Sequence, residues 1–267
     1  MPLVPIGDSE LYYEEQGRGT GDPIVFSHGL LWSGRMYAAQ MAALSDTWRC
    51  IAYDHRGQGR SATSPSPYDM DTLADDAARL IDKLKAGPCH FVGLSMGGFV
   101  GLRLALRRPE LLRSLTLIDT AADREPRLNV PKYAAMAWAA RRVGMKFLVP
   151  SVMKIMFGGA FLRDRKRAGL RAEQAAWLAS LEPVRMKAAL DSVTQRHAVQ
   201  SSLSAVKTPT LVLHGEDDRA IKLPRATQMA LAIPGAELVV IARAGHTSTV
   251  EEPEAISREL RRFVEVH

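Results

Sequence analysis

The chain has 267 residues, of which 46% are hydrophobic and 24% charged, a composition typical of a globular protein that can bury a sizeable core. The net charge of +6 is not gathered into a basic run with interleaved aromatic residues, so it does not predict nucleic-acid binding. The sequence has no basic-then-apolar secretory signal, no apolar stretch near the ~18 residues of a membrane span, and only two cysteines, so we expect a cytoplasmic protein without a disulfide framework.

Short apolar runs alternate with helical patterns along the chain. Residues 8–22 predict an antiparallel edge strand with a glycine-rich turn. Near-continuous apolar runs, which are typical of strands covered on both faces, predict buried strands at residues 23–29, 49–57, 90–95, 115–120, 210–215 and 237–245. Helical spacing over residues 73–84, and prolines at 224 and 253 that suit a first helical turn, predict helices around these strands. This alternation predicts an α/β protein with a parallel sheet and helices on both faces.

One segment interrupts the alternation. Between residues 121 and 208 no strong strand pattern appears, and the composition is helical and rich in methionine, tryptophan and basic residues. We therefore predict a core built from residues 1–121 and 200–267, and a mainly helical cap at residues 122–199. The last helix of this cap, near residues 183–197, is expected to return to the sheet.

A Gly-x-Ser-x-Gly motif, Gly93, Ser95 and Gly97, separates a predicted strand from a helical pattern within HFVGLSMGG. A serine on such a turn projects its hydroxyl from the sheet edge, and the flanking glycines relieve crowding. The backbone N–H of the next residue, Met96, then points toward a developing oxyanion. The motif alone is weak evidence, but its position between strand and helix indicates a nucleophilic serine rather than a flexible turn.

A nucleophilic serine needs a base, and histidine has a pKa close to neutrality. Four of the seven histidines follow predicted strands and can face the carboxyl edge of the sheet, where catalytic groups gather. They are His28, His55, His214 and His246.

A carboxylate must hold the imidazole of that base and stabilise its charged form. Several acidic residues that follow predicted strands are candidates, although an acidic cluster in this position is also typical of a solvated turn. They are Asp119, Glu216, Asp217 and Asp218.

Five sequence blocks together resemble the α/β-hydrolase fold family, of the capped carboxylesterase and 3-oxoadipate enol-lactonase type. They cover nearly the whole chain in the family's order, and they read IVFSHGL, YDHRGQGRS, GLSMGG, LHGEDD and AGHTSTVEEPE. The resemblance implies a mostly parallel eight-stranded sheet flanked by helices, with a helical cap inserted after the sixth strand. It also implies the order nucleophile, acid, histidine, so Ser95, Asp218 and His246 are the expected triad, with Asp119 at a less common acid position.

The same resemblance implies that the backbone N–H groups of Leu30 and Met96 form the oxyanion hole. The expected activity is that of a serine hydrolase that cleaves small carboxylic esters or lactones through an acyl-enzyme, without a metal or an organic cofactor. A small-molecule substrate is the only partner expected, with no nucleic acid and no membrane, and no oligomeric state is predicted. A carbon–carbon hydrolase, a perhydrolase or haloperoxidase, and a non-enzymatic receptor of the same fold stay open as alternatives.

The family's sheet order has a consequence for the two cysteines, because it places the strand of His28 between the strands of Cys50 and Cys89. Cysteines that can form a disulfide have Cα atoms within about 7 Å, whereas strands on either side of a third are roughly 9–10 Å apart. We therefore expect two free thiols.

Apolar residues near the SHGL block and in the cap are candidates for the substrate pocket, although such residues at helical spacing more often fill a core. The candidates are Leu31, Trp32, Met136, Trp138, Met153, Met156 and Phe157. Between Arg141 and Arg171 the cap carries nine basic residues and one acidic residue, which we interpret as a solvated surface rather than an anion site. We therefore expect short, uncharged or weakly polar esters and lactones, with a carboxylate-bearing enol-lactone as the alternative.

Overall fold

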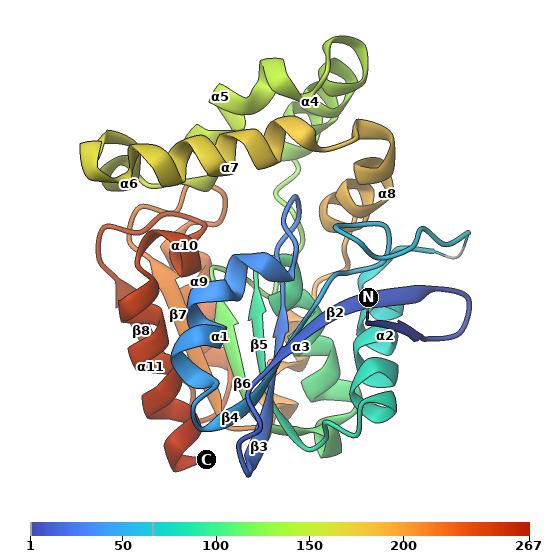
Figure 1. The fold of residues 1–267 in the computed structure, drawn as a ribbon, viewed down its shortest axis with the longest axis vertical. Coiled ribbons are helices and arrows are strands. Elements are labelled where there is room, and N and C mark those ends of the chain that lie inside the picture. The colour runs from blue at the N-terminus through green and yellow to red at the C-terminus, as the bar shows by residue number, and fades with distance from the viewer. Residues whose placement is uncertain (1, 66) are drawn as a thin grey trace.

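The computed structural model describes residues 2–65 and 67–267 as a sheet between two layers of helices, with further helices above one sheet edge (Figure 1). The strands are β1 (Leu3–Pro5), β2 (Glu10–Gln16), β3 (Gly21–Ser27), β4 (Trp48–Tyr53), β5 (Cys89–Leu94), β6 (Leu112–Ile118), β7 (Thr210–Gly215) and β8 (Glu237–Ile241). They form one sheet of order β1-β2-β4-β3-β5-β6-β7-β8, in which β2 is antiparallel to both its neighbours and the other pairs are parallel. The predicted mostly parallel eight-stranded sheet is confirmed.

Two hydrophobic clusters, one on each face of the sheet, hold the flanking helices. The helices are α1 (Ala38–Leu44), α2 (Met70–Lys83), α3 (Met96–Arg107), α9 (Leu223–Ala232), α10 (Ser248–Glu251) and α11 (Pro253–Val266). Helices α2, α3 and α9 pack on one face, and α1 and α11 on the other (Figure 1). Along β3, Ile24 and Phe26 join the second cluster while Val25 joins the first, so the strand is apolar at consecutive positions.

Local sequence signals explain where the predicted helices begin. Helix α2 starts at Met70, earlier than the periodic pattern indicates, because the Asp69 side chain caps it by accepting hydrogen bonds from the N–H groups of Asp71 and Thr72. Helices α9 and α11 each have the predicted proline in the first turn. The three predicted helices are therefore confirmed.

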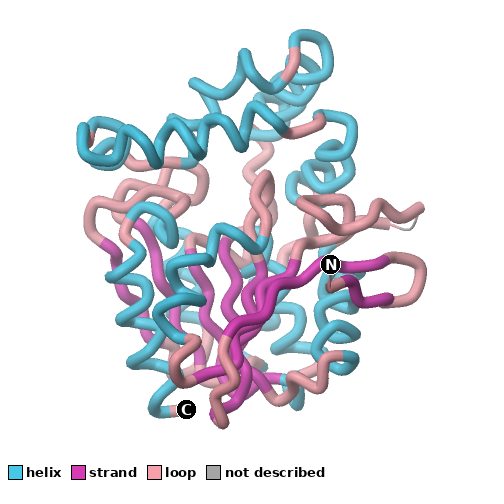
Figure 2. The backbone as a smooth tube through the Cα atoms, viewed as in Figure 1, coloured by secondary structure: helices cyan, strands magenta, loops and turns pink. Residues whose placement is uncertain are grey.

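The chain between β6 and β7 forms a layer of helices above the carboxyl edge of the sheet (Figures 1 and 2). These are α4 (Asn129–Val143), α5 (Met145–Met156), α6 (Gly159–Arg163), α7 (Ala168–Ser180) and α8 (Pro183–Thr194), which we call the cap helices. The N–H of Val199 donates to the carbonyl of Ala122 at 2.8 Å, which joins the two ends of this insertion. The domain boundaries at residues 121 and 200 stay a prediction.

The N-terminal prediction needs a correction. The predicted antiparallel strand and glycine-rich turn are confirmed in residues 8–22, because β2 is antiparallel to β4 and the chain then reverses at Gly17, whose φ of 81° suits glycine. The predicted edge position is wrong. Strand β1 lies outside β2 and takes the sheet edge. The expectation for the cysteines is confirmed, since β3 separates β4 from β5 and both thiols are free and buried. No helix within the described residues is both long and apolar enough to cross a membrane.

Candidate active site

Ser95 lies on a strained turn between β5 and α3. Its backbone angles, φ of 52° and ψ of −109°, are outside the regions that residues with a side chain ordinarily adopt. The flanking glycines allow backbone segments to approach closely: a Cβ at Gly93 would lie 2.3 Å from the carbonyl oxygen of Gly97, and one at Gly97 would lie 2.0 Å from that of Ser27. The turn therefore presents the Ser95 side chain at the carboxyl end of the central strand, next to β3.

His246 connects Ser95 to Asp218. Its Nε2 lies 2.9 Å from Ser95 Oγ, and its Nδ1 lies 2.8 Å from Asp218 Oδ2. Because a carboxylate only accepts, Nδ1–H donates to Asp218 and Nε2 is left to accept the serine proton. Burial alone would lower the pKa of His246, but the Asp218 carboxylate raises it above the ordinary value of histidine. The three side chains expected to act together are thus brought into one hydrogen-bonded line.

The loop after β7 fixes Asp218 and directs its neighbour elsewhere. Asp218 Oδ1 accepts from the N–H groups of Ala220 and Ile221 at 2.8 and 2.9 Å, which leaves Oδ2 for His246. Asp217 is half exposed and its Oδ2 accepts from the N–H of Gly159 at the start of α6. The structure therefore favours Asp218 over Asp217 as the partner of the histidine.

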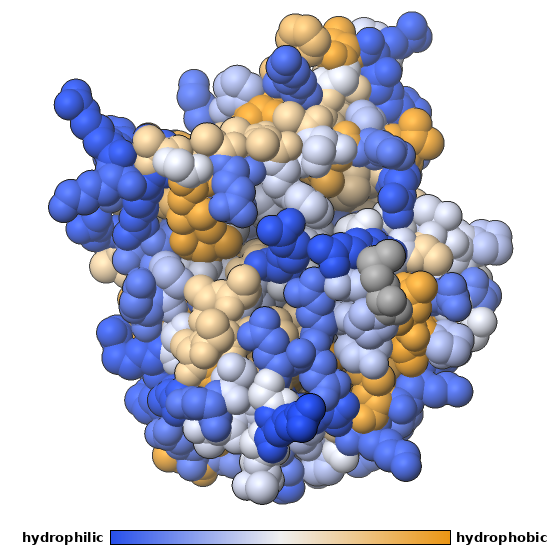
Figure 3. Space-filling view, viewed as in Figure 1, coloured by the Kyte–Doolittle hydropathy of each residue, from blue (hydrophilic) through white to orange (hydrophobic). Residues whose placement is uncertain are grey.

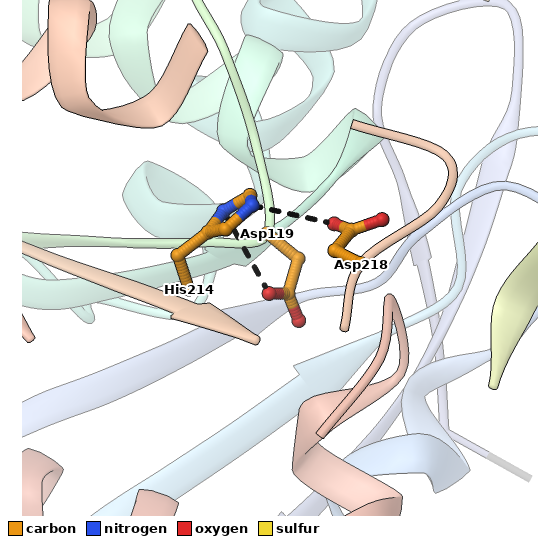
Figure 4. A group of neighbouring side chains, drawn as sticks. All are labelled: Asp119, His214 and Asp218. Atoms are coloured by element: carbon orange, nitrogen blue, oxygen red, sulfur yellow. Dashed lines mark ion pairs between the residues drawn. The ribbon is translucent and has the colours of Figure 1, made fainter. Parts of the chain in front are cut away.

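Asp119 and His214 lie beside Asp218, and all three are buried (Figure 4). Asp119 Oδ1 accepts from the N–H of Gly215 at 2.7 Å, and its Oδ2 accepts from the hydroxyl of Ser248 at 2.6 Å. His214 Nε2–H donates to the carbonyl of Ile221 at 3.0 Å. A cation among these three groups would compete with His246 for Asp218. We therefore assign Asp119 and His214 to the support of the loops that carry the triad residues.

The other histidines at this sheet edge have structural partners. His28 donates from Nδ1 to the carbonyl of Gly29 and accepts at Nε2 from the N–H of His55. His55 Nε2 lies 3.0 Å from the hydroxyl of Ser27. Burial lowers the pKa of both rings, which keeps them neutral. They hold the loops that follow β3 and β4.

The predicted oxyanion donors flank Ser95. Met96 is the first residue of α3, so its N–H has no partner within the helix. A Cβ at Gly29 would lie 3.5 Å from the Cβ of Ser95, which places the chain before Leu30 against the serine. Within the described residues, no hydrogen bond uses the Leu30 N–H. Among the described residues, neither amide therefore has a hydrogen-bond partner, and Leu30 and Ser95 line the same cavity.

A cavity of about 150 Å³ lies between Ser95, His246 and the cap helices. Most of its lining side chains are apolar and come from α4, α5 and α8. Three of the seven predicted pocket residues line it, as does the oxyanion candidate Leu30: these three are Leu31, Met136 and Met156.

The other four predicted pocket residues lie elsewhere. Trp138 is wrong as a pocket residue, because it is on the outer face of α4 and 57% exposed. Phe157 is fully buried, with its ring stacked on Phe161 at 4.7 Å and edge-on to Trp32 at 5.9 Å. Met153 is buried in the same cluster. Trp32, Met153 and Phe157 therefore fill the interior between the cap and the sheet.

Sequence reasoning missed two residues that the structure places beside the site. Trp177 of α7 donates from Nε1 to the carbonyl of Leu31 at 2.8 Å and so holds a loop residue whose φ is 73°. Glu251 accepts from the N–H groups of Gly158 and Gly245, which ties the cap to the His246 loop. Trp177 belongs to no motif, and Glu251 lies within the AGHTSTVEEPE block without a role that the sequence alone assigns, so only the tertiary contacts reveal what the two side chains do.

Comparisons with known proteins agree with this geometry. Residues 22–253 match the family described as alpha/beta hydrolase fold. RutD of Pseudomonas syringae pv. syringae, named as a proposed carbamate hydrolase, is 31% identical over an alignment of 253 positions that covers 90% of this chain and 93% of that protein.

Two solved structures are similar over nearly the whole chain. The enol-lactonase from Burkholderia xenovorans LB400 superposes with a TM-score of 0.90 at 29% identity, and covers 99% of this chain and 100% of its own. A thermophilic esterase from Thermogutta terrifontis gives a TM-score of 0.88 at 30% identity, with 96% and 93% covered. These proteins are hydrolases by name, and the chain described here is a hydrolase that belongs to the alpha/beta hydrolase fold family.

Proposed function

We propose that the protein is a serine hydrolase that cleaves small carboxylic esters or lactones through an acyl-enzyme. The observation that carries this proposal is the continuous hydrogen-bonded line from Ser95 Oγ through His246 to Asp218 Oδ2, with bonds of 2.9 and 2.8 Å. Such a line supplies a nucleophile, a base and a group that orients the base.

In the first step Ser95 Oγ attacks the carbonyl carbon of the substrate while its proton passes to His246 Nε2. The N–H groups of Leu30 and Met96 stabilise the oxyanion that forms. The bond to the leaving oxygen then breaks, and His246 returns the proton to that oxygen. In the second step His246 takes a proton from water, the hydroxide adds to the acyl carbon, and Ser95 leaves with the proton.

The lining of the cavity favours esters and lactones over small polar carbamates. A carbamate presents a comparable carbonyl to the serine, and the similarity to RutD makes a carbamate the alternative substrate. However, the apolar wall built by α4, α5 and α8 gives binding energy only to a substrate that carries an apolar group. We therefore propose an acyl chain or lactone ring with apolar substituents as the group that fills the cavity.

The test is a steady-state comparison of p-nitrophenyl esters, lactones and a carbamate with the purified protein. Ser95→Ala is expected to lower kcat for every cleaved substrate by at least about a thousandfold, since it removes the nucleophile. The matched control is Ser202→Ala, because Ser202 is an exposed serine and its loss is expected to leave kcat unchanged. Retention of more than a tenth of the activity by Ser95→Ala would overturn the proposal, and a carbamate as the best substrate would overturn the choice of substrate.

A further inference from the structure

An ion pair interrupts the apolar wall of the cavity. Arg196 follows α8, Glu125 precedes α4, and both contribute to the wall that also holds Ser95 and His246. Their residues are only 5% and 6% exposed. Burial of two charges carries a desolvation cost, and apolar residues of similar size would close the wall without that cost. The pair therefore calls for an explanation beyond packing.

The donors of Arg196 are only partly satisfied. Its Nε–H donates to the carbonyl of Asp123 at 3.1 Å, and its Nη1 donates to Glu125 Oε2 at 3.0 Å and to the carbonyl of Val193 at 2.6 Å. Its Nη2 is buried and has no hydrogen-bond partner among the residues that the structure describes. Buried guanidinium N–H groups without acceptors are costly, so a substrate acceptor that comes within reach of Nη2 from the cavity would be bound.

The position of Arg196 relative to Ser95 limits where on the substrate that acceptor atom can lie. The guanidinium lies over the ring of Phe99, with its central carbon 4.1 Å from the ring centroid. Phe99 is four residues after Ser95 and therefore about one helical turn, or ~5.4 Å, along α3. Ser95 and Arg196 both line the cavity from separate segments, so an acceptor for Arg196 would be carried on the acyl chain away from the reacting carbonyl.

The charge around Arg196 selects the kind of acceptor. Glu125 already balances the guanidinium, and a substrate carboxylate at Nη2 would also face the charge of Glu125. An uncharged oxygen meets no such repulsion. The cavity volume of about 150 Å³ is that of a protein cavity that holds benzene, so an acyl group of about six carbons is of suitable size.

We propose that Arg196 is a specificity-determining residue whose Nη2 donates to an uncharged carbonyl oxygen on the acyl chain, with Glu125 as the positioning residue that excludes a carboxylate there. The preferred substrates are then esters or lactones of oxo-acids or related acyl groups with a second, internal carbonyl. This inference rests on the proposed function for the reacting carbonyl, but the binding of the second oxygen can be measured without turnover.

The experiment compares three phenyl esters of nearly identical shape: 5-oxohexanoate, 5-methylhexanoate and the monoester of glutarate. Their Kd values are measured by calorimetry with the Ser95→Ala protein, alone and combined with Arg196→Lys, which keeps a positive charge near Glu125 but lacks Nη2. The preference for the oxo ester over the methyl ester is expected to fall about tenfold in the Arg196→Lys protein, as a charge-assisted hydrogen bond is lost. An unchanged preference would overturn the proposal.

A second variant tests the charge argument and serves if Arg196→Lys fails to fold. Glu125→Gln keeps Arg196 but removes the balancing charge, so binding of the glutarate monoester relative to the oxo ester is expected to improve about tenfold. A merely structural ion pair would leave this ratio unchanged, and that result would contradict the proposal. If the ratios shift as expected while the wild-type protein cleaves none of the three esters, the carbonyl site stands and the proposed esterase activity fails.

Discussion

The carboxyl edge of the sheet and the cap helices build the site in different ways. At the carboxyl edge of the sheet, polar side chains are fixed by short, directed hydrogen bonds, such as those of His246. Glycines are required there because a Cβ at Gly93 or Gly97 would lie less than 2.5 Å from a backbone oxygen. The cap contributes mainly apolar contacts from α4, α5 and α8, interrupted by the pair of Glu125 and Arg196. Figure 3 shows hydrophilic side chains with separate apolar patches over these upper helices. Substitutions of the triad residues at the carboxyl edge are therefore expected to abolish nearly all activity. Substitutions in the cap are expected to change stability or substrate preference by graded amounts.

The largest expected effect is at the sheet edge. Asp218→Asn is expected to lower kcat by about 10⁴-fold, because an amide at this position no longer holds the histidine in the tautomer that accepts the serine proton. The measurement is kcat for the best p-nitrophenyl ester, with folding checked by circular dichroism.

Asp217→Asn is the matched control, because its carboxylate bonds to the N–H of Gly159 and not to His246. It is expected to lower kcat by less than about tenfold, since the hydrogen bond that it weakens lies outside the triad. A larger loss in Asp217→Asn, or in Asp119→Asn, than in Asp218→Asn would reverse the assignment of the acid.

Within the cap, the burial of an aromatic residue rather than its type is expected to set how much its substitution lowers the free energy of unfolding. Phe157→Ala is expected to lower the free energy of unfolding by about 3–5 kcal/mol, because it leaves a cavity between Phe161 and Trp32. Trp138→Ala, on the exposed face of α4, is expected to change it by about 0.5 kcal/mol or less. Urea denaturation of the two variants gives both values, and equal values would break the distinction between buried and exposed cap residues.

A smaller effect, on the pH dependence of stability, is expected at Glu251, which links the cap to the carboxyl edge of the sheet. Burial raises the pKa of its carboxyl to about 7, above the ~4.3 of an unfolded chain. The folded protein therefore holds the proton more tightly, and this contribution to stability is present below pH ~4.3 and lost as the pH rises to about 7.

Glu251→Gln removes this titration. The free energy of unfolding of the variant, relative to wild type, is expected to rise by about 3 kcal/mol between pH 4 and pH 8, whatever its offset at pH 4. Glu254→Gln, at an exposed position of α11, is the control and is expected to show no such slope. Denaturation curves at several pH values measure both, and a flat difference for Glu251→Gln would contradict the account.

The sheet edge could be predicted from the sequence because its residues are dictated locally. Only glycine fits at positions 93 and 97, where a Cβ would meet backbone atoms, so the motif around Ser95 carries structural information by itself. The acid was not settled by the residues alone, since Asp119, Asp217 and Asp218 all follow strands. The family's spacing pointed to Asp218, and the hydrogen bond to His246 agrees with that choice.

The cavity wall that the cap helices form could not be predicted to the same extent, because helical spacing does not say which face of a helix lines the cavity. Met136 and Trp138 are two residues apart on α4, yet one lines the cavity and the other faces solvent. The pairing of Glu125 with Arg196 depends on residues 71 positions apart and has no local signal. Such contacts are set by how the cap helices pack, which the sequence pattern leaves undetermined.

The most direct test of the central claim is whether Ser95 Oγ forms a covalent bond to the phosphorus of a phosphonylating reagent, with loss of fluoride. The wild-type protein is incubated with a fluorophosphonate, and its intact mass and peptide masses are measured. The account predicts one adduct, on the peptide that contains Ser95, with a rate that falls sharply in Asp218→Asn and a signal that is lost in Ser95→Ala. An adduct on another residue, or equal labelling of the Ser95→Ala protein, would contradict it.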